Sequence, residues 1–107
     1  MAPTFYITIN IYGDNATLHN IMNEIVYIVF GVGNSQNEGV KNLVQKWSFG
    51  TFQYHIDGDH LNITYTYSND FRHGIHIEQI AQRYPTITFE EIGSGDEEWY
   101  AEYNIGG

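Results

Sequence analysis

The most constraining feature of this sequence is a strict alternation of apolar and polar residues over positions 4–12. The apolar members are Phe5, Ile7, Ile9 and Ile11, and the alternate members are Thr4, Tyr6, Thr8, Asn10 and Tyr12. A period of two is typical of a β-strand whose side chains point in turn to the two faces of a sheet. We therefore expect a sheet with one face buried under other elements and one face open.

Two later segments have the period of an amphipathic helix. Gly13-Asp14-Asn15 interrupts the first strand and offers N-cap side chains. The apolar stripe that follows comprises Leu18, Ile21, Met22, Ile25, Ile28 and Val29. This helix should end near the glycine-rich segment 31–34. A second, shorter helix should follow a cap at 68–70, with Ile77, Ile80, Ala81 and Tyr84 on its apolar face and Pro85 at its end.

The remaining segments favour four further strands. Residues 47–56 are rich in aromatic and β-branched types, and Asp57-Gly58 is a strong hairpin signal before an alternating strand at 61–67. A fourth strand is expected around Ile87 and Phe89, and a fifth carries Trp99, Ala101, Tyr103 and Ile105. Segment 34–46 is the least regular, with one or two helical turns expected around Val40, Leu43 and Val44.

These elements predict a single α+β domain over residues 1–107. Their order, β-α-β-β-α-β-β, begins with the β-α-β-β-α-β pattern of the ferredoxin-like, or split βαβ, sandwich. We therefore expect an antiparallel sheet with two helices on one face, extended by a terminal hairpin.

Several segments in the C-terminal part of the chain form a recognisable pattern: Arg83-Tyr84-Pro85-Thr86-Ile87-Thr88-Phe89, the Gly-rich turn, the aromatic strand that closes on Gly106, and Lys46-Trp47-Ser48-Phe49-Gly50-Thr51. In these segments the chain resembles the YubB-like ferredoxin-like domain family of phage and plasmid proteins. Where the family tends to have Trp-Ser-Pro-Pro before its second helix, this chain has Tyr67-Ser68-Asn69-Asp70. The resemblance implies an origin on a mobile genetic element and supplies no catalytic residues.

Charge is the most unusual property of the chain. Thirteen acidic residues face only four basic ones, which gives a net charge of −9. Such a chain would repel nucleic acid and anionic membranes, because both are bound mainly through Lys and Arg. The charge predicts instead a host protein or ribonucleoprotein partner with a basic surface.

The acidic residues are concentrated in the last hairpin. We predict a partner-binding surface there, formed by Glu90, Glu91, Asp96, Glu97, Glu98, Tyr100 and Glu102, with Tyr103 as a further aromatic neighbour. Three of these acids (Glu90, Glu98 and Glu102) alternate with the apolar residues of the strands and should share the exposed face. The alternative interpretation is that charge on an edge strand only prevents aggregation.

Other site chemistries find less support in the sequence. A turn at Asp57-Gly58 would place His55 opposite His60, where Asp57 or Asp59 could complete a metal site, and His73 and His76 form a second pair. Neither pair belongs to a defined ligand motif, and no nucleophile or phosphate-loop motif is present. We therefore expect no metal, no cofactor and no enzymatic activity.

The open sheet face is expected to carry Tyr6, Tyr12 and Tyr54. In basic surroundings such rings stack on RNA bases, but in acidic surroundings they suit contact with a protein or with a second copy of the chain. A cytoplasmic location is expected, since the sequence has no cysteine and no visible signal peptide. Its longest apolar run, residues 25–30, is too short to cross a membrane.

Two functions follow from this pattern. The first is a small acidic phage or mobile-element protein that inhibits a host nucleic-acid-handling defence complex, such as a CRISPR effector, by occupying its basic groove as a nucleic-acid mimic. The second is a non-catalytic accessory module that dimerises or binds protein through its Tyr-rich sheet and is acidic only for solubility.

Overall fold

The computed structural model describes residues 4–30, 49–68, 77–95 and 97–105. The described elements follow one another as β1 (Thr4–Tyr12), α1 (Asn15–Phe30), β2 (Phe49–Asp57), β3 (His60–Ser68), α3 (Ile77–Arg83), β4 (Thr88–Ser94) and β5 (Glu98–Tyr103). The predicted α+β class is confirmed. The helical turns expected around Val40 lie outside the described residues, as do His73, His76 and Asp96. Of the helix cap expected at 68–70, only residue 68 is described.

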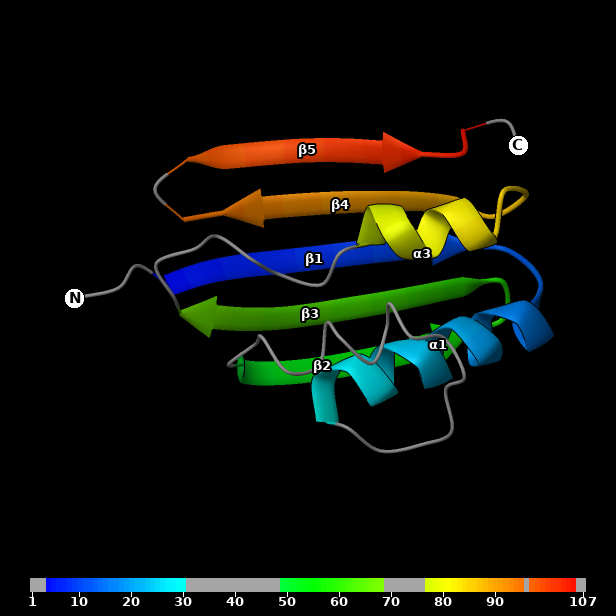
Figure 1. Cartoon of the computed structure of the whole chain (residues 1–107), viewed down its shortest axis with the longest axis horizontal. Coiled ribbons are helices and arrows are strands. Elements are labelled where there is room, and N and C mark those ends of the chain that lie inside the picture. Colours follow the sequence, from blue (N-terminus) through cyan, green and yellow to red (C-terminus); the bar gives the residue numbers. More distant parts are fainter. Residues whose placement is uncertain (1–3, 31–48, 69–76, 96, 106–107) are drawn as a thin grey trace.

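The strands form one antiparallel sheet in the order β2-β3-β1-β4-β5, and α1 and α3 both lie on the same face of it (Figure 1). β1 is the central strand, with Ile9 opposite Ile63 of β3 on one side and Glu91 of β4 on the other. β3 lies between β1 and β2. This arrangement is compatible with a ferredoxin-like sandwich.

The core fills the space between the sheet and the two helices. Its members from β1 confirm the predicted alternation, since Phe5, Ile7, Ile9 and Ile11 are all at most 2% exposed. The helices contribute Leu18, Ile21, Met22, Ile25, Ile77, Ile80 and Ala81. Leu61, Ile63, Tyr65, Ile87 and Phe89 complete the core. Neither described helix is both long and apolar enough to cross a membrane.

The start of α1 is set by Asp14, as the sequence predicts. Its Oδ2 accepts hydrogen bonds from the Thr17 backbone N–H at 3.0 Å and from the Thr17 hydroxyl at 2.8 Å. These bonds stabilise the charged form and lower the pKa of Asp14. Next to it, Asn15 Nδ2 donates to the Gly58 carbonyl at 2.9 Å and joins the helix start to the β2–β3 hairpin.

The β2–β3 turn differs from the prediction by one residue. Its two central residues are Gly58 and Asp59, so that Asp57 pairs with His60, and His55 pairs with Asn62. Gly58 has a φ of 61°, the left-handed value that glycine tolerates best, and it takes the first central position, as in type II′ turns. The expected direct pairing of His55 with His60 is therefore wrong.

The end of α3 is held by side chains from distant parts of the chain. Glu24 of α1 accepts hydrogen bonds from Arg83 Nη2 at 2.5 Å and from the Tyr84 hydroxyl at 3.0 Å. Desolvation and the neighbouring Glu24 carboxylate raise the pKa of Tyr84 to about 12. Asn104, which follows β5, donates from Nδ2 to the carbonyls of Ala81 at 2.9 Å and Tyr84 at 3.0 Å.

The same Asn104 ends the last strand earlier than predicted. Its φ of 60° is incompatible with an extended strand, and β5 stops at Tyr103. Ile105, which the alternation placed on the apolar side of a longer strand, is 64% exposed. The extension of the fifth strand through Ile105 is therefore wrong.

Candidate functional site

The sheet face opposite the helices, here called the outer face, has described residues on every strand. Strand register and alternation place on it residues 6, 8, 10 and 12 of β1, 53, 55 and 57 of β2, 60, 62, 64 and 66 of β3, 88, 90, 92 and 94 of β4, and 98, 100 and 102 of β5. Within these described positions there is no Lys or Arg. The described part of the outer face is therefore acidic.

Three carboxylates gather on the β4–β5 hairpin, and we call them the acidic patch (Glu90, Glu98 and Glu102). Glu90 lies directly opposite Glu102, and Glu98 lies opposite Ser94. Tyr100, opposite Ile92, stands between the two glutamates of β5. The predicted sharing of one face by the three acids is confirmed. Like charges directly opposite one another destabilise a sheet, so the fold tolerates this arrangement at a cost.

Glu91 belongs to the other side of the sheet and not to the acidic patch. It pairs with Ile9 and Ala101, both on the helix face, and its Oε1 lies 3.4 Å from Trp99 Nε1, which donates to it. Burial raises the pKa of Glu91. Of the other predicted members, Glu97 is exposed in the turn and Asp96 lies outside the described residues. The structure thus brings together Glu90, Glu98, Tyr100 and Glu102.

A chain of hydrogen bonds crosses the outer face and holds Glu90 in place. Asn10 Nδ2 donates to Glu90 Oε1 at 2.9 Å, and the Tyr100 hydroxyl donates to Glu90 Oε2 at 2.9 Å. On its other side Asn10 Oδ1 accepts from Asn62 Nδ2 at 2.9 Å and lies 2.8 Å from His60 Nε2. Both oxygens of Glu90 are therefore bound, and the bonded side chains span β3, β1, β4 and β5.

Sequence reasoning did not single out Asn10. The only local signal is an amide at an outward position of a strand that otherwise carries Thr and Tyr there. Its role depends on three cross-strand neighbours, Asn62, His60 and Glu90, which become visible only when the register is known. At the far end of the chain of bonds, desolvation and hydrogen bonds to Glu90 and Glu102 raise the pKa of Tyr100.

Exposed rings adjoin the acidic patch. Tyr6 is 59% exposed and Tyr100 is 55% exposed, both on the outer face, and Tyr12 stacks on His60 with ring centroids 4.8 Å apart. Tyr54, in contrast, pairs with Ile63 and lies on the helix face, although it too is exposed. The predicted placement of Tyr54 beside Tyr6 and Tyr12 is therefore wrong.

The histidines of the β2–β3 hairpin share the outer face but do not form an obvious metal site. His60 is engaged with Asn10 and Tyr12, and His55 lies opposite Asn62. Among the residues that the structure describes, no three His, Asp or Glu side chains are grouped so that they could hold a metal ion.

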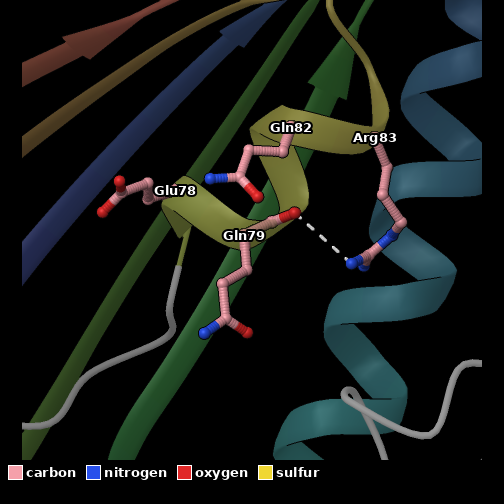
Figure 2. Close-up of a pocket in the computed structure, with 4 residues that line it drawn as sticks. All are labelled: Glu78, Gln79, Gln82 and Arg83. Atoms are coloured by element: carbon pink, nitrogen blue, oxygen red, sulfur yellow. Dashed lines mark hydrogen bonds between the residues drawn. The ribbon is translucent and has the colours of Figure 1, made fainter.

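A polar pocket lies on α3, on the other side of the sheet from the acidic patch. Figure 2 shows its lining of Glu78, Gln79, Gln82 and Arg83 from this one short helix. Arg83 Nη1 donates to the Gln79 carbonyl at 3.3 Å, and its other terminal nitrogen is paired with Glu24. The guanidinium is thus bound to other groups of the protein. The remaining lining residues supply one exposed carboxylate and two amides, a set that indicates no particular chemistry.

Comparison with known proteins found no matching family model, no matching curated protein and no matching solved structure. The resemblance to the YubB-like family therefore stays a prediction.

Proposed function

We propose that this chain is a small non-catalytic protein of a phage or mobile element that inhibits a host nucleic-acid-handling defence complex. In this proposal the acidic patch covers a basic groove that normally holds nucleic acid. The observation that carries it is the set of three carboxylates on one face of the β4–β5 hairpin, with no Lys or Arg at the described positions of that face. Such a face is complementary to a protein surface that binds phosphates.

The hydrogen bonds around Glu90 support this proposal. A carboxylate held by Asn10 and Tyr100 loses little further freedom when it meets a cationic side chain, so ordering it costs less on binding. The exposed rings of Tyr6 and Tyr100 offer the kind of aromatic anchor that dominates many protein interfaces.

The strand order supports a finer fold assignment. With β3 between β1 and β2 and both helices on one face, we infer a ferredoxin-like sandwich extended by β5. Ferredoxin-like proteins that bind RNA present aromatic rings on the equivalent open face. Here that face is acidic, which favours a protein partner over RNA.

The test is capture of the partner from host lysate, followed by competition with nucleic acid. The purified partner complex should bind its guide or target nucleic acid more weakly when the chain is present. Glu98→Lys with Glu102→Lys should relieve this competition by about tenfold or more, since each reversal replaces an attraction by a repulsion. Glu90 is left unchanged because its hydrogen bonds contribute to the fold.

The matched control is Asp59→Lys with Glu78→Lys. It changes the net charge by the same amount, but Asp59 lies in the β2–β3 turn and Glu78 on α3. Both are exposed, and neither belongs to the β4–β5 hairpin. If both double variants lose inhibition equally, or if neither loses any, the acidic patch does not act as a nucleic-acid mimic.

The second candidate is an accessory module that dimerises or binds protein through the outer face. It is favoured by the exposure of Tyr6, Ile92 and Tyr100 on that face. Light scattering at several protein concentrations separates the two. The accessory module predicts a dimer that strengthens as salt rises, whereas the mimic predicts a monomer whose contact with a basic partner weakens as salt rises.

A further inference from the structure

β5 forms one margin of the sheet and presents a backbone edge that no other described strand covers (Figure 1). Its pairing with β4 is continuous over six residue pairs, from Glu98 to Tyr103, without a register shift. β2, at the opposite margin, has a register shift between Phe49 and Phe52. Bulges of this kind disfavour pairing at an edge, so β5 is the better template for an additional strand.

The side chains of β5 determine which strand could be added. Glu98, Tyr100 and Glu102 point to the outer face, while Trp99, Ala101 and Tyr103 point to the helix face. A second copy of β5 paired antiparallel about Tyr100 would place Glu98 of one copy opposite Glu102 of the other. This repulsion disfavours self-pairing, and the same two carboxylates would attract Lys or Arg on a different strand.

A surface hollow lies over β4 and β5 and includes one carboxylate of the acidic patch. It is lined by Ile92, Gly93, Ser94, Glu98, Trp99 and Tyr100. Ile92 and Tyr100 offer apolar surface on which the methylene stem of Lys or Arg can lie, and Glu98 supplies a carboxylate for the charged end. In addition to the β5 edge, the hollow is a second feature that matches a basic extended segment.

We propose that β5 binds an extended basic segment of the partner protein as a sixth strand of the sheet. Backbone hydrogen bonds along residues 98–103 hold the segment, and its Lys or Arg side chains face Glu98 and Glu102 on the outer face. Alternate apolar residues of the segment face Trp99 and Tyr103. This inference depends on the proposed function, because it specifies how the basic partner is held.

The experiment uses the full chain and an octapeptide of alternating Lys and Val, blocked at both ends. Amide hydrogen exchange should slow in residues 98–103 when the peptide is added, and should not change in β2. The same peptide N-methylated at every residue keeps its charges but lacks donors, and it should bind at least about tenfold more weakly. Glu98→Gln with Glu102→Gln should weaken binding about fivefold at low salt, and Asp59→Asn with Glu78→Gln should leave it unchanged.

Three results would overturn this inference. They are equal binding of the N-methylated peptide, protection at β2 instead of β5, and a dimer of the chain that protects residues 98–103 without peptide. Its failure is distinguishable from failure of the proposed function. If the peptide does not bind but a host complex is still captured through the acidic patch, only strand addition is wrong. If the peptide adds to β5 but nucleic-acid binding by host complexes is unaffected, only the inhibitor proposal is wrong.

Discussion

Trp99 covers Gly93 on the helix face, and the contact leaves no room for a larger residue. A Cβ at position 93 would lie 2.1 Å from Trp99 Cζ2, and the indole also packs near Phe5 with ring centroids 6.1 Å apart. We expect Gly93→Ala to displace the indole and lower the free energy of unfolding by about 1–3 kcal/mol. Urea denaturation followed by circular dichroism measures the change.

The control for this prediction is a double-mutant cycle with Trp99→Ala. If the indole is the source of the clash, Gly93→Ala should cost much less in the Trp99→Ala background. An equal cost in both backgrounds would place the strain in the backbone of β4 instead.

Asn104 closes the end of α3 from the other end of the chain. Asn104→Asp keeps the size of the side chain and its tolerance of positive φ, but a carboxylate cannot donate to the Ala81 and Tyr84 carbonyls. We expect a loss of about 2–3 kcal/mol at neutral pH. The loss should shrink at a pH low enough to protonate the new carboxyl, which can then donate one bond. Urea denaturation at both pH values tests this, with Asn20→Asp on the exposed side of α1 as the control.

Glu91 makes stability depend on pH in a defined direction. Its folded-state pKa is raised by burial, so between the unfolded and folded pKa values the folded state holds more protons. The free energy of unfolding contributed by this group therefore falls as pH rises through that window. We expect Glu91→Gln to remove this fall, since Gln can still accept from Trp99. Unfolding measured from acid to neutral pH should show a flatter profile in the variant. An unchanged profile would contradict the assignment.

At the scale of elements, the Asn10 side chain connects β1 to both of its neighbours, β3 and β4, through hydrogen bonds on the outer face. Asn10→Ala would remove the partner of His60 and Asn62 on one side and of Glu90 on the other. We expect it to cost about 1–3 kcal/mol, whereas Thr8→Ala on the same face should cost within about 0.5 kcal/mol. A cycle with Glu90→Ala should give a coupling energy, because the two side chains are in contact. Urea denaturation of the four variants measures it, and additive effects would contradict the network.

Alternation and helical period are enough to predict most elements of this fold. The apolar residues of β1 and the two helical stripes are local patterns. Phe5, Ile7, Ile9 and Ile11 are buried as expected, as are the helix residues Leu18, Ile21, Met22, Ile25, Ile77, Ile80 and Ala81, whereas Tyr84 is half-buried and lies just beyond α3. Strand register is not local in this way. The hairpin turn differs from the prediction by one residue because Gly58, with its positive φ, takes the first central position instead of the second, and this register places His60 opposite Asp57. Asn104 ended β5 through contacts with residues about twenty positions away.

The candidate site was predictable only where it depends on the local alternation of strand residues. Period two places Glu90, Glu98 and Glu102 on one face, and it also places Glu91 on the other, since consecutive strand residues point in opposite directions. The density of acidic residues in the hairpin predicts Glu91 as a member of the partner-binding surface, but its place in the strand puts it on the helix face. The fixing of Glu90 by Asn10 could not be predicted, because it joins residues 80 positions apart.

At the scale of the whole molecule, a net charge of −9 should make stability sensitive to ionic strength. We expect the melting temperature to rise between about 0.01 M and 0.3 M NaCl, as screening reduces repulsion between carboxylates. Glu102→Gln removes a like-charge pair with Glu90 and should stabilise the chain at low salt by about 0.2–1 kcal/mol. Glu78→Gln, with the same change in net charge, should stabilise it less. Thermal unfolding of the three proteins at both salt concentrations tests this, and equal shifts would contradict a special role for the pair.

The central position of β1 has a consequence for the order in which the sheet assembles. β1 comes first among the described strands, yet both of its neighbours, β3 and β4, come much later in the chain. Long loops must close before the middle of the sheet gains any partner, and this should make folding slower than that of a helical bundle, in which most contacts are local. The β2–β3 hairpin needs only a two-residue turn and can pair early. We therefore expect assembly of the sheet to start at the β2–β3 hairpin, and β1 to remain unpaired until β3 has formed.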